Sequence, residues 1–248
     1  MTLEDFFHSN PKAALAFSGG VDSAYLLYAA CRCGADVRPY YVKTCFQPAF
    51  EFQDAEKLAR SLGVSMTVVE IPILDKERIR ENPGDRCYYC KKAILGAILE
   101  QARRDGYDLL LDGTNASDDI SDRPGYRALQ ELEVRSPLRE AGLTKKRIRE
   151  LSHEAGLFTW DKPAYACLAT RIPTGVPIEE KNLAAIERGE AALSGLGFRD
   201  FRLRLLGTAA KLQVREEQME QVLAKRDRIR DALREDFSDI FLDLEARP

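Results

Sequence analysis

The stretch AALAFSGGVDSAYLLYAACRC, residues 13–33, decides the fold, because an apolar run, a turn with two glycines and an amphipathic segment follow one another directly. A run of five apolar residues that ends at a turn is typical of a buried strand. The segment after the turn has the length and apolar spacing of a helix that covers this strand. A strand, a tight turn and a helix in this order predict the first unit of an open α/β sheet.

The same alternation continues to about residue 112. Apolar runs lie at 37–42, 67–71 and 107–111, and helix-length segments lie between them at 50–62 and 91–104. Nearly continuous apolar strands joined by helices are typical of a parallel sheet that is covered on both faces. We therefore predict α/β architecture with a doubly wound parallel sheet.

The chain is predicted to have three parts. Residues 1–160 form the α/β domain, in which the Gly-, Asn-, Asp- and Pro-rich residues 112–140 predict a long functional loop region. Thr144 is the expected N-cap of a helix that ends at Gly156. Residues 161–177 are a cysteine-bearing linker with prolines and a glycine. Residues 178–248 form a small C-terminal α+β domain, with helices predicted at 178–196 and 216–230 and strands at 199–205, 211–215 and 240–244.

Composition limits the class of protein. The 248 residues are 45% hydrophobic and 31% charged, with a net charge of −3, which is typical of a globular protein with a sizeable core. No basic stretch precedes an apolar run near the N-terminus, and no segment has the roughly 20 apolar residues of a membrane helix. We expect a cytoplasmic protein with a small-molecule substrate. The acidic balance does not favour nucleic acid or a membrane as a partner.

The turn after the first strand carries the chemistry of a phosphate site. It consists of Ser18, Gly19, Gly20, Val21, Asp22 and Ser23. Glycine lets the backbone approach a phosphate closely, and the following helix adds unpaired N–H groups and the positive end of its dipole. The turn has neither the lysine of GxxxxGK[ST] nor the spacing of GxGxxG. A glycine-rich turn without a ligand is the alternative interpretation.

SGGVDS at a strand-to-helix junction resembles the PP-loop of the N-type ATP pyrophosphatases, which have the adenine nucleotide alpha hydrolase-like fold. The resemblance implies that the loop binds the β- and γ-phosphates of ATP while AMP is transferred to a substrate. Ligands of open α/β sheets lie beyond the carboxyl ends of the strands, and the resemblance places Lys43, Gly113 and Thr114 there beside the adenosine. Asp22 is the expected Mg²⁺ ligand, directly or through water.

Six cysteines in a chain expected in a reducing compartment indicate metal-binding, catalytic or buried thiols. Cys87 and Cys90 form a CxxC before a helix predicted from about Lys91, and Cys167 lies in the linker. A CxxC alone is compatible with a redox pair, half a zinc site or coincidence. Three cysteine thiolates could instead hold a [4Fe-4S] cluster with one open iron that carries a sulfide.

A more specific resemblance rests on five segments in the same order along the chain. They are RCYYCKK (86–92), DGTNASDD (112–119), RPGYRA (123–128), SPLREAGLTK (136–145) and KPAYACLATRI (162–172). Together they resemble the LarE family over roughly residues 11–215. The resemblance implies an ATP-dependent sulfurtransferase that acts on pyridinium-3,5-biscarboxylic acid mononucleotide, the precursor of the nickel-pincer nucleotide cofactor.

The resemblance also implies two possible sulfur sources. In one subtype, a cysteine at the position of Cys167 gives up its own sulfur. In the other, cysteines at the positions of Cys87, Cys90 and Cys167 hold a [4Fe-4S] cluster that relays sulfide. All three positions are cysteine here, so we favour the cluster subtype, and three thiols without a metal remain an alternative. Sulfide or a sulfur donor protein is the expected source of sulfur, and the family implies a homo-oligomer such as a hexamer.

The resemblance assigns four charged residues to the phosphate of the substrate: Arg171, Glu190, Arg202 and Arg204. The planar donor fork of arginine suits phosphate. The alternatives are a half-buried strand face for Arg202 and Arg204 and a solvated helix for Glu190. This chain has Leu205 and Leu206 where the family often has two histidines, so a related carboxylate could be the substrate. Asp118 and Asp122 are further candidates near the metal or the nucleotide.

Two other functions compete with this interpretation. A PP-loop tRNA thiolation enzyme shares the ATP chemistry and a three-cysteine cluster, but it commonly has extra zinc-binding cysteines and a basic surface. A nucleotide-binding regulatory module on the same scaffold would bind ATP without cleaving it. For the sulfurtransferase, adenylylation turns a carboxylate into a mixed anhydride, from which a sulfur nucleophile displaces AMP.

Overall fold

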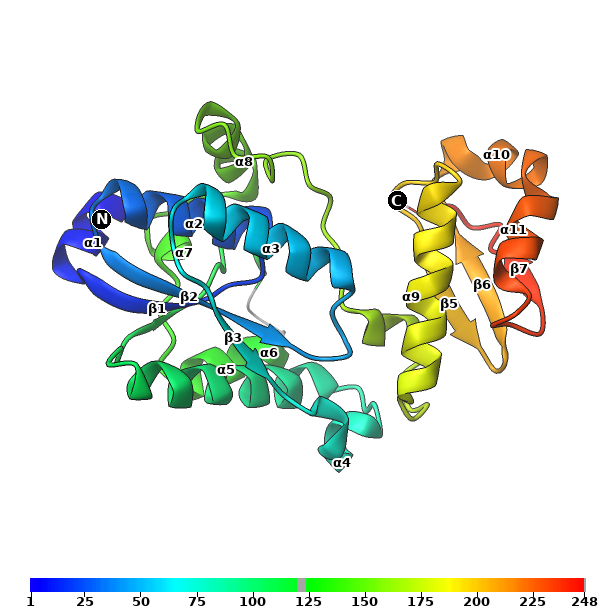
Figure 1. The fold of residues 1–248 in the computed structure, drawn as a ribbon, viewed down its shortest axis with the longest axis horizontal. Coiled ribbons are helices and arrows are strands. Elements are labelled where there is room, and N and C mark those ends of the chain that lie inside the picture. Colours follow the sequence, from blue (N-terminus) through cyan, green and yellow to red (C-terminus); the bar gives the residue numbers. More distant parts are fainter. Residues whose placement is uncertain (120–123, 248) are drawn as a thin grey trace. The chain divides into compact units, whose positions relative to one another are not determined.

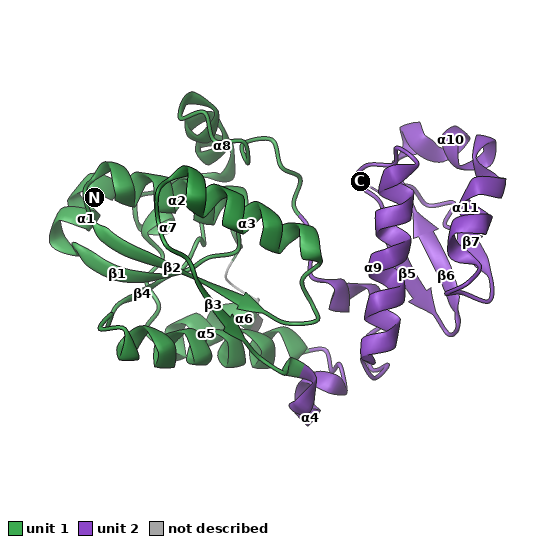
Figure 2. Cartoon of the chain, in the orientation of Figure 1, with its two compact units in different colours: residues 1–73, 85–164 green, residues 74–84, 165–248 purple. Residues whose placement is uncertain are grey.

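The computed structural model describes residues 1–119 and 124–247. The chain divides into two compact units, which are coloured separately in Figure 2. The first unit contains Met1–Ile73 and Asp85–Ala164, and the second contains Leu74–Gly84 and Tyr165–Pro248. Residues 74–84 therefore belong with the second unit, although the predicted boundaries place them in the first domain. No helix in the described part of the chain has the length and apolar composition needed to cross a bilayer.

A parallel sheet forms the centre of the first unit (Figure 1). Its strands are β1 (Lys12–Ala16), β2 (Asp36–Lys43), β3 (Thr67–Glu70) and β4 (Leu110–Leu111). Their order across the sheet is β3-β2-β1-β4, with all pairs parallel. Because the chain leaves β1 first toward β2 and later returns to the other side of β1, the sheet changes winding direction at β1. The carboxyl end of β1 is therefore the place where a ligand site is expected.

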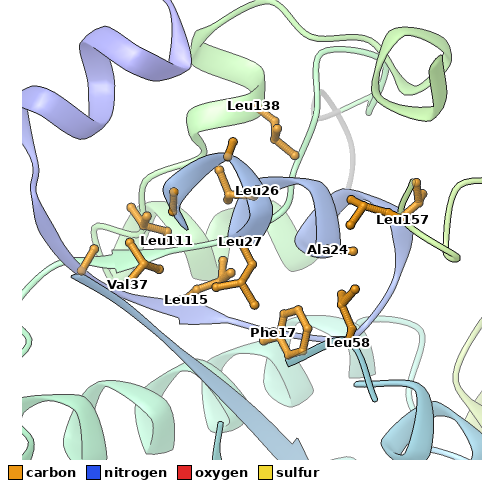
Figure 3. Packing of buried hydrophobic residues seen from close by; sticks show 14 of the residues in the cluster. Leu15, Phe17, Ala24, Leu26, Leu27, Val37, Leu58, Leu111, Leu138 and Leu157 are labelled. Carbon is orange, nitrogen blue, oxygen red and sulfur yellow. The ribbon is translucent and has the colours of Figure 1, made fainter. Parts of the chain in front are cut away.

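Helices cover both faces of this sheet. They are α1 (Leu3–Ser9), α2 (Val21–Arg32), α3 (Ala49–Ser61), α5 (Arg86–Arg104), α6 (Pro124–Glu131), α7 (Pro137–Glu140) and α8 (Lys145–Glu154). Leu15 of β1 packs into a cluster with α1, α2, α3, α7 and α8, which Figure 3 shows at close range. The neighbouring Ala14 faces a second cluster with α5 and α6. Successive strand residues thus point to opposite covered faces, which confirms the predicted doubly wound sheet.

Two local predictions in this unit were wrong. Helix α5 begins at Arg86, five residues before the predicted start, so Cys87 and Cys90 lie inside its first turns. Pro83 and Gly84, just before the N-cap Asp85, are residues that commonly end a loop. The region predicted as a long loop contains α6 and α7, and Pro137 occupies the first position of α7, where proline suits a helix start.

The second unit is the predicted small α+β domain. Its strands are β5 (Arg202–Leu206), β6 (Ala209–Gln213) and β7 (Ile240–Leu242), with β5 antiparallel and β7 parallel to β6. Its helices are α4 (Glu77–Arg80), α9 (Glu180–Gly195), α10 (Met219–Ala224) and α11 (Arg226–Leu233), with 3₁₀ turns η2 (Leu168–Arg171) and η3 (Glu216–Gln218). A side chain at Gly189 would place its Cβ 2.5 Å from Leu203, so the glycine lets α9 lie directly on β5.

Residues 74–84 lie within the first unit in sequence but belong to the second, and Asn82 holds them there. Its side-chain Nδ2 donates to the carbonyl oxygens of Pro173 and Val176, at 2.9 and 3.2 Å. The carbonyl of Asn82 accepts from the N–H of Gly175 at 2.8 Å. Asn82 has a φ of 56°, a left-handed conformation that asparagine tolerates better than most residues. These bonds explain why residues 74–84 separate from the unit that surrounds them in sequence.

Candidate functional site

The predicted phosphate loop lies at the carboxyl end of β1 and opens α2. Gly19 has a φ of +69°, and an added Cβ would come within 2.9 Å of the Cα of Ala55 in α3. The loop can take this path only because residue 19 has no side chain. Val21 is the first residue of α2 and is buried in the core, which fixes the start of the helix.

Hydrogen bonds between two hydroxyl side chains close the loop. Ser18 Oγ and Ser23 Oγ lie 3.1 Å apart. The N–H of Gly20 donates to Ser18 Oγ at 3.3 Å, and Ser23 Oγ donates to the carbonyl of Gly20 at 3.2 Å. Neither serine caps α2, and Gly20 at its N-cap has no side chain to do so. The N–H groups of the first turn therefore keep the capacity to bind an anion.

Asp22 binds a lysine that the sequence analysis did not select. Lys145, the first residue of α8, lies with its Nζ 2.5 Å from Asp22 Oδ2. Asn115 Nδ2 donates to Asp22 Oδ1 at 3.4 Å. Burial raises the pKa of Asp22 above its ordinary value, and the ammonium of Lys145 offsets part of that rise. A carboxylate that has lost much of its water is a strong ligand for a cation.

The segment after β4 reaches this loop. An added Cβ at Gly113 would lie 3.1 Å from the N–H nitrogen of Ser23, so the two segments touch. Thr114 donates from N and Oγ1 to the carboxylate of Asp112, at 3.2 and 2.5 Å. Gly113 and Thr114 are thus brought to the start of α2, as the strand order requires.

The remaining candidate residues for the nucleotide and the metal are Lys43, Asp118 and Asp122. Lys43 ends β2, and its Nζ pairs with Glu70 at 3.1 Å on an exposed surface. Asp118 accepts a hydrogen bond from the N–H of Asn115 at 2.9 Å and so shapes the loop that carries Asn115. Asp122 and Arg123 lie outside the described residues.

The CxxC occupies the first turns of α5. Cys87 is exposed and Cys90 is buried. Residues three apart on a helix share one face, so the two thiols are neighbours on the surface of α5. Arg86 is itself buried, and its Nη1 donates to Cys90 Sγ at 3.8 Å.

Cys167 precedes the 3₁₀ turn η2 in the second unit and is half-buried. Its carbonyl oxygen accepts from Thr170, through the N–H at 3.0 Å and Oγ1 at 2.8 Å. Arg171 Nη1 donates to the carbonyl of Ala166 at 2.8 Å. The backbone of the cysteine is therefore fixed from within its own turn.

Four charged residues assigned to the substrate phosphate lie close together around this turn. Arg171 and Glu190 form a buried ion pair, with Nε and Oε1 2.8 Å apart. Arg204 Nη1 donates to the carbonyl of Thr170 at 2.8 Å. Burial lowers the pKa of both Arg202 and Arg204, and the neighbouring charge of Arg171 lowers it further. Positive charges that crowd one another in this way favour a bound anion.

A metal site needs several ligand side chains that converge on one point. Among residues 1–119 and 124–247, no three His, Cys, Asp or Glu side chains converge as ligands of one metal ion. The thiols with the right chemistry are divided between the units, with Cys87 and Cys90 in the first and Cys167 in the second. For Mg²⁺, Asp22 is the carboxylate at the phosphate loop.

The chain is similar over most of its length to several known proteins, although no protein-family model matches it. An uncharacterised protein of Synechocystis sp. is 33% identical over 224 residues, which cover 88% of this chain and 82% of that protein. A pyridinium-3,5-bisthiocarboxylic acid mononucleotide synthase of Lactiplantibacillus plantarum is 31% identical over 220 residues, which cover 88% of this chain and 80% of the synthase.

A more distant similarity links the chain to enzymes that act on RNA. A tRNA-specific 2-thiouridylase of a Thermotoga species is 26% identical over 192 residues, which cover 59% of this chain and 52% of that enzyme. This relationship supports the adenine nucleotide alpha hydrolase-like fold of the first unit.

Proposed function

The chain belongs to the LarE family, and on that premise we propose that it is an ATP-dependent sulfurtransferase of nickel-pincer nucleotide biosynthesis. Its substrate is pyridinium-3,5-biscarboxylic acid mononucleotide, of which a carboxylate is adenylylated and then converted to a thiocarboxylate. The relative from Lactiplantibacillus plantarum, a pyridinium-3,5-bisthiocarboxylic acid mononucleotide synthase, supports this substrate class.

One observation carries the proposal: the loop at residues 18–23 is shaped for phosphate and has a cation and a carboxylate beside it. Gly19 takes a left-handed conformation against α3, and Asp22 pairs with Lys145 at 2.5 Å. In the proposed reaction, the N–H groups at the start of α2 hold the pyrophosphate of ATP as it leaves. Asp22 would hold Mg²⁺, which neutralises charge on the phosphate oxygens.

The reaction has two steps. An oxygen of the substrate carboxylate attacks the α-phosphorus of ATP, and the bond to pyrophosphate breaks. A sulfur nucleophile then attacks the activated carbonyl carbon, and AMP leaves with the former carboxylate oxygen. Gly113 and Thr114, next to the loop, are proposed to line the adenosine together with Lys43.

Lys145 supplies the cation that the loop sequence lacks. Its ammonium neutralises Asp22 when no nucleotide is bound. We propose that its ammonium binds the phosphates of ATP, since Asp22 would then hold Mg²⁺ instead of the lysine. Such a change needs only a rotation of the flexible lysine side chain.

The sulfur is proposed to reach the substrate through cysteines. Cys87, Cys90 and Cys167 have the chemistry to hold a [4Fe-4S] cluster, which when bound supplies an open iron for a sulfide. The guanidinium of Arg86, 3.8 Å from Cys90 Sγ, lies beside one of these proposed ligands. Sulfide or a sulfur donor protein would provide the sulfur. Donation of the sulfur of Cys167 itself is the alternative.

Arg202 and Arg204 are proposed to bind the phosphate of the substrate. Burial and the nearby charge of Arg171 lower the pKa of both guanidinium groups, and a bound anion would stabilise their charged form. Arg171 and Glu190 were predicted to take part in the same site. A homo-oligomer, as the family implies, is part of the proposal.

The direct test is a reaction with ATP, Mg²⁺, sulfide and pyridinium-3,5-biscarboxylic acid mononucleotide under anaerobic conditions. We expect AMP and pyrophosphate in the ³¹P spectrum and a product in which one oxygen is replaced by sulfur. Anaerobic protein should be brown, with iron that is lost on Cys87→Ala, Cys90→Ala or Cys167→Ala.

Other results would select the alternatives. Colourless protein that loses one sulfur from Cys167 during turnover would establish sacrificial donation. Release of ADP, or no nucleotide cleavage in the presence of substrate, would contradict the proposal. Salt-sensitive binding of tRNA would favour a thiolation enzyme that modifies RNA.

A further inference from the structure

The carboxylate of Glu190 is the centre of a buried network in the second unit. Its Oε1 accepts from Arg171 Nε at 2.8 Å and from the N–H of Leu203 in β5 at 3.0 Å. Its Oε2 accepts from Tyr165 Oη at 2.5 Å and from Arg171 Nη2 at 3.1 Å. Four donors thus use the four lone-pair directions of one carboxylate.

Two of the donors bracket Cys167 in the sequence. Tyr165 lies two residues before the cysteine, and Arg171 lies four residues after it. The guanidinium of Arg171 also lies 4.6 Å from the ring centroid of Tyr165, so the two side chains contact each other as well as Glu190. One residue of α9 therefore fixes both ends of the turn that carries the cysteine.

Arg171 reaches further into the turn. Its Nη1 donates to the carbonyl of Ala166 at 2.8 Å, lies 3.5 Å from the carbonyl of Cys167 and lies 2.9 Å from Thr170 Oγ1. The guanidinium thus joins the backbone on either side of the reactive sulfur to a helix of the domain core. A backbone held in this way gives the cysteine side chain a fixed origin.

Burial argues against a direct contact of this pair with substrate. The side chain of Arg171 is 1% exposed and that of Glu190 is 8% exposed. A phosphate could reach Arg171 only if the guanidinium left Glu190, which would leave an uncompensated buried carboxylate. Arg204 differs from Arg171 in that it donates to the neutral acceptors Gln213 Oε1 and Thr170 O, at 2.5 and 2.8 Å.

We propose that Glu190, Arg171 and Tyr165 are positioning residues that hold the Cys167 turn, and that Glu190 and Arg171 do not bind the substrate. The consequence for sulfur transfer rests on the proposed function. The proposal that these residues hold the turn does not rest on the proposed function, because it concerns only bonds within the second unit.

Glu190→Gln tests this proposal at nearly constant volume. Glutamine keeps one acceptor oxygen and puts an NH₂ donor where Tyr165 and Arg171 also donate, so the network cannot be satisfied. Tyr165→Phe removes one bond and leaves the buried ion pair, so it keeps the test valid if Glu190→Gln fails to fold. Glu180→Gln, at the exposed start of α9, is the matched charge control.

The first measurement is the rate at which iodoacetamide alkylates Cys167 in ligand-free protein, followed by peptide mass spectrometry across a range of pH. Cys167 is half-buried, and release of its turn exposes the thiol. We expect alkylation to accelerate at least about fivefold in Glu190→Gln, less in Tyr165→Phe and not at all in Glu180→Gln.

The second measurement separates positioning from substrate binding. In Glu190→Gln we expect kcat for thiocarboxylate formation to fall about tenfold or more, while the Kd for pyridinium-3,5-biscarboxylic acid mononucleotide stays within about twofold. A large loss of substrate affinity with unchanged alkylation of Cys167 would overturn the proposal, as would unchanged alkylation in both network variants. If the wild-type protein forms no thiocarboxylate, the proposed function fails, and alkylation still decides whether the turn is held.

Discussion

Replacement of Gly19 by alanine should damage the phosphate loop in two ways that can be estimated separately. The left-handed φ of +69° costs a residue with a Cβ about 1–2 kcal/mol. The new Cβ would also lie 2.9 Å from the Cα and Cβ of Ala55, so the loop or α3 must move, at a cost of about 1–3 kcal/mol. Together these effects lower the free energy of unfolding by about 2–5 kcal/mol, a large share of the usual stability of a domain.

Gly20→Ala is the matched control, because it lies in the same loop and meets neither obstacle. Its φ is −78°, and its nearest neighbour is Ser18 Oγ at 3.4 Å from an added Cβ. We expect a change of less than about 1 kcal/mol. Urea unfolding followed by fluorescence of Trp160, the single tryptophan, reports the first unit. ATP–pyrophosphate exchange should fall about 100-fold in Gly19→Ala, because the loop is displaced. Equal effects of the two substitutions on stability and exchange would refute this explanation of the loop.

Three further predictions concern Asp22, Lys145 and Asn82. Lys145→Met should reduce ATP–pyrophosphate exchange by about 10–100-fold through lost charge-assisted bonds, whereas Lys146→Met, on the exposed side of α8, should not. Because burial raises the pKa of Asp22 in the folded protein, its ionisation costs stability as pH rises through that value. Asp22→Asn should therefore be more stable relative to wild type in urea at pH 7 than at pH 3.5, and inactive; a constant difference would contradict this. Asn82→Ala should lower the unfolding free energy of the second unit by about 2–3 kcal/mol, since it loses side-chain bonds and favourable backbone conformation. Asn82→Gly should recover the share of this free energy that is due to the left-handed φ. Faster proteolysis within residues 172–178 of the variants would show that this loop has been released.

The sheet could be predicted because its strands carry a strong local signal. Leu15 and Ala14 enter different cores, and only a strand covered on both faces allows five consecutive apolar residues. The place of the phosphate loop follows from the same segment, since β1, the glycines and α2 are adjacent in sequence.

Lys145 was missed although the sequence contains a signal for it. Lys145 and Lys146 directly follow Thr144, the observed N-cap of α8, so two cations stand at the positive end of a helix dipole. Such a placement is locally unfavourable and indicates a partner elsewhere. That partner is Asp22, 123 residues away, and no local pattern identifies it.

The pairing of Arg171 with Glu190 could not be predicted for a related reason. The family resemblance assigned both residues to the substrate phosphate, and an arginine in a linker or a glutamate in a helix is usually exposed. Their burial depends on the close approach of α9 to β5, which Gly189 permits by having no side chain. Packing of this kind is decided by the tertiary fold, and the sequence pattern of either element does not contain it.

Buried charge occurs in two kinds of surroundings in this chain, and the contrast supports a division between rigid support and ligand binding. Around Cys167, Glu190 compensates Arg171 fully, which suits a rigid support. Burial and the charge of Arg171 lower the pKa of Arg202 and Arg204, and burial raises the pKa of Asp22, which Lys145 offsets only in part. Uncompensated charge lowers stability unless a ligand of opposite sign can bind, so natural proteins keep it chiefly at functional sites. Burial disfavours the charged forms of Asp22, Arg202 and Arg204, and this supports the proposal that they bind Mg²⁺ and the anionic substrate.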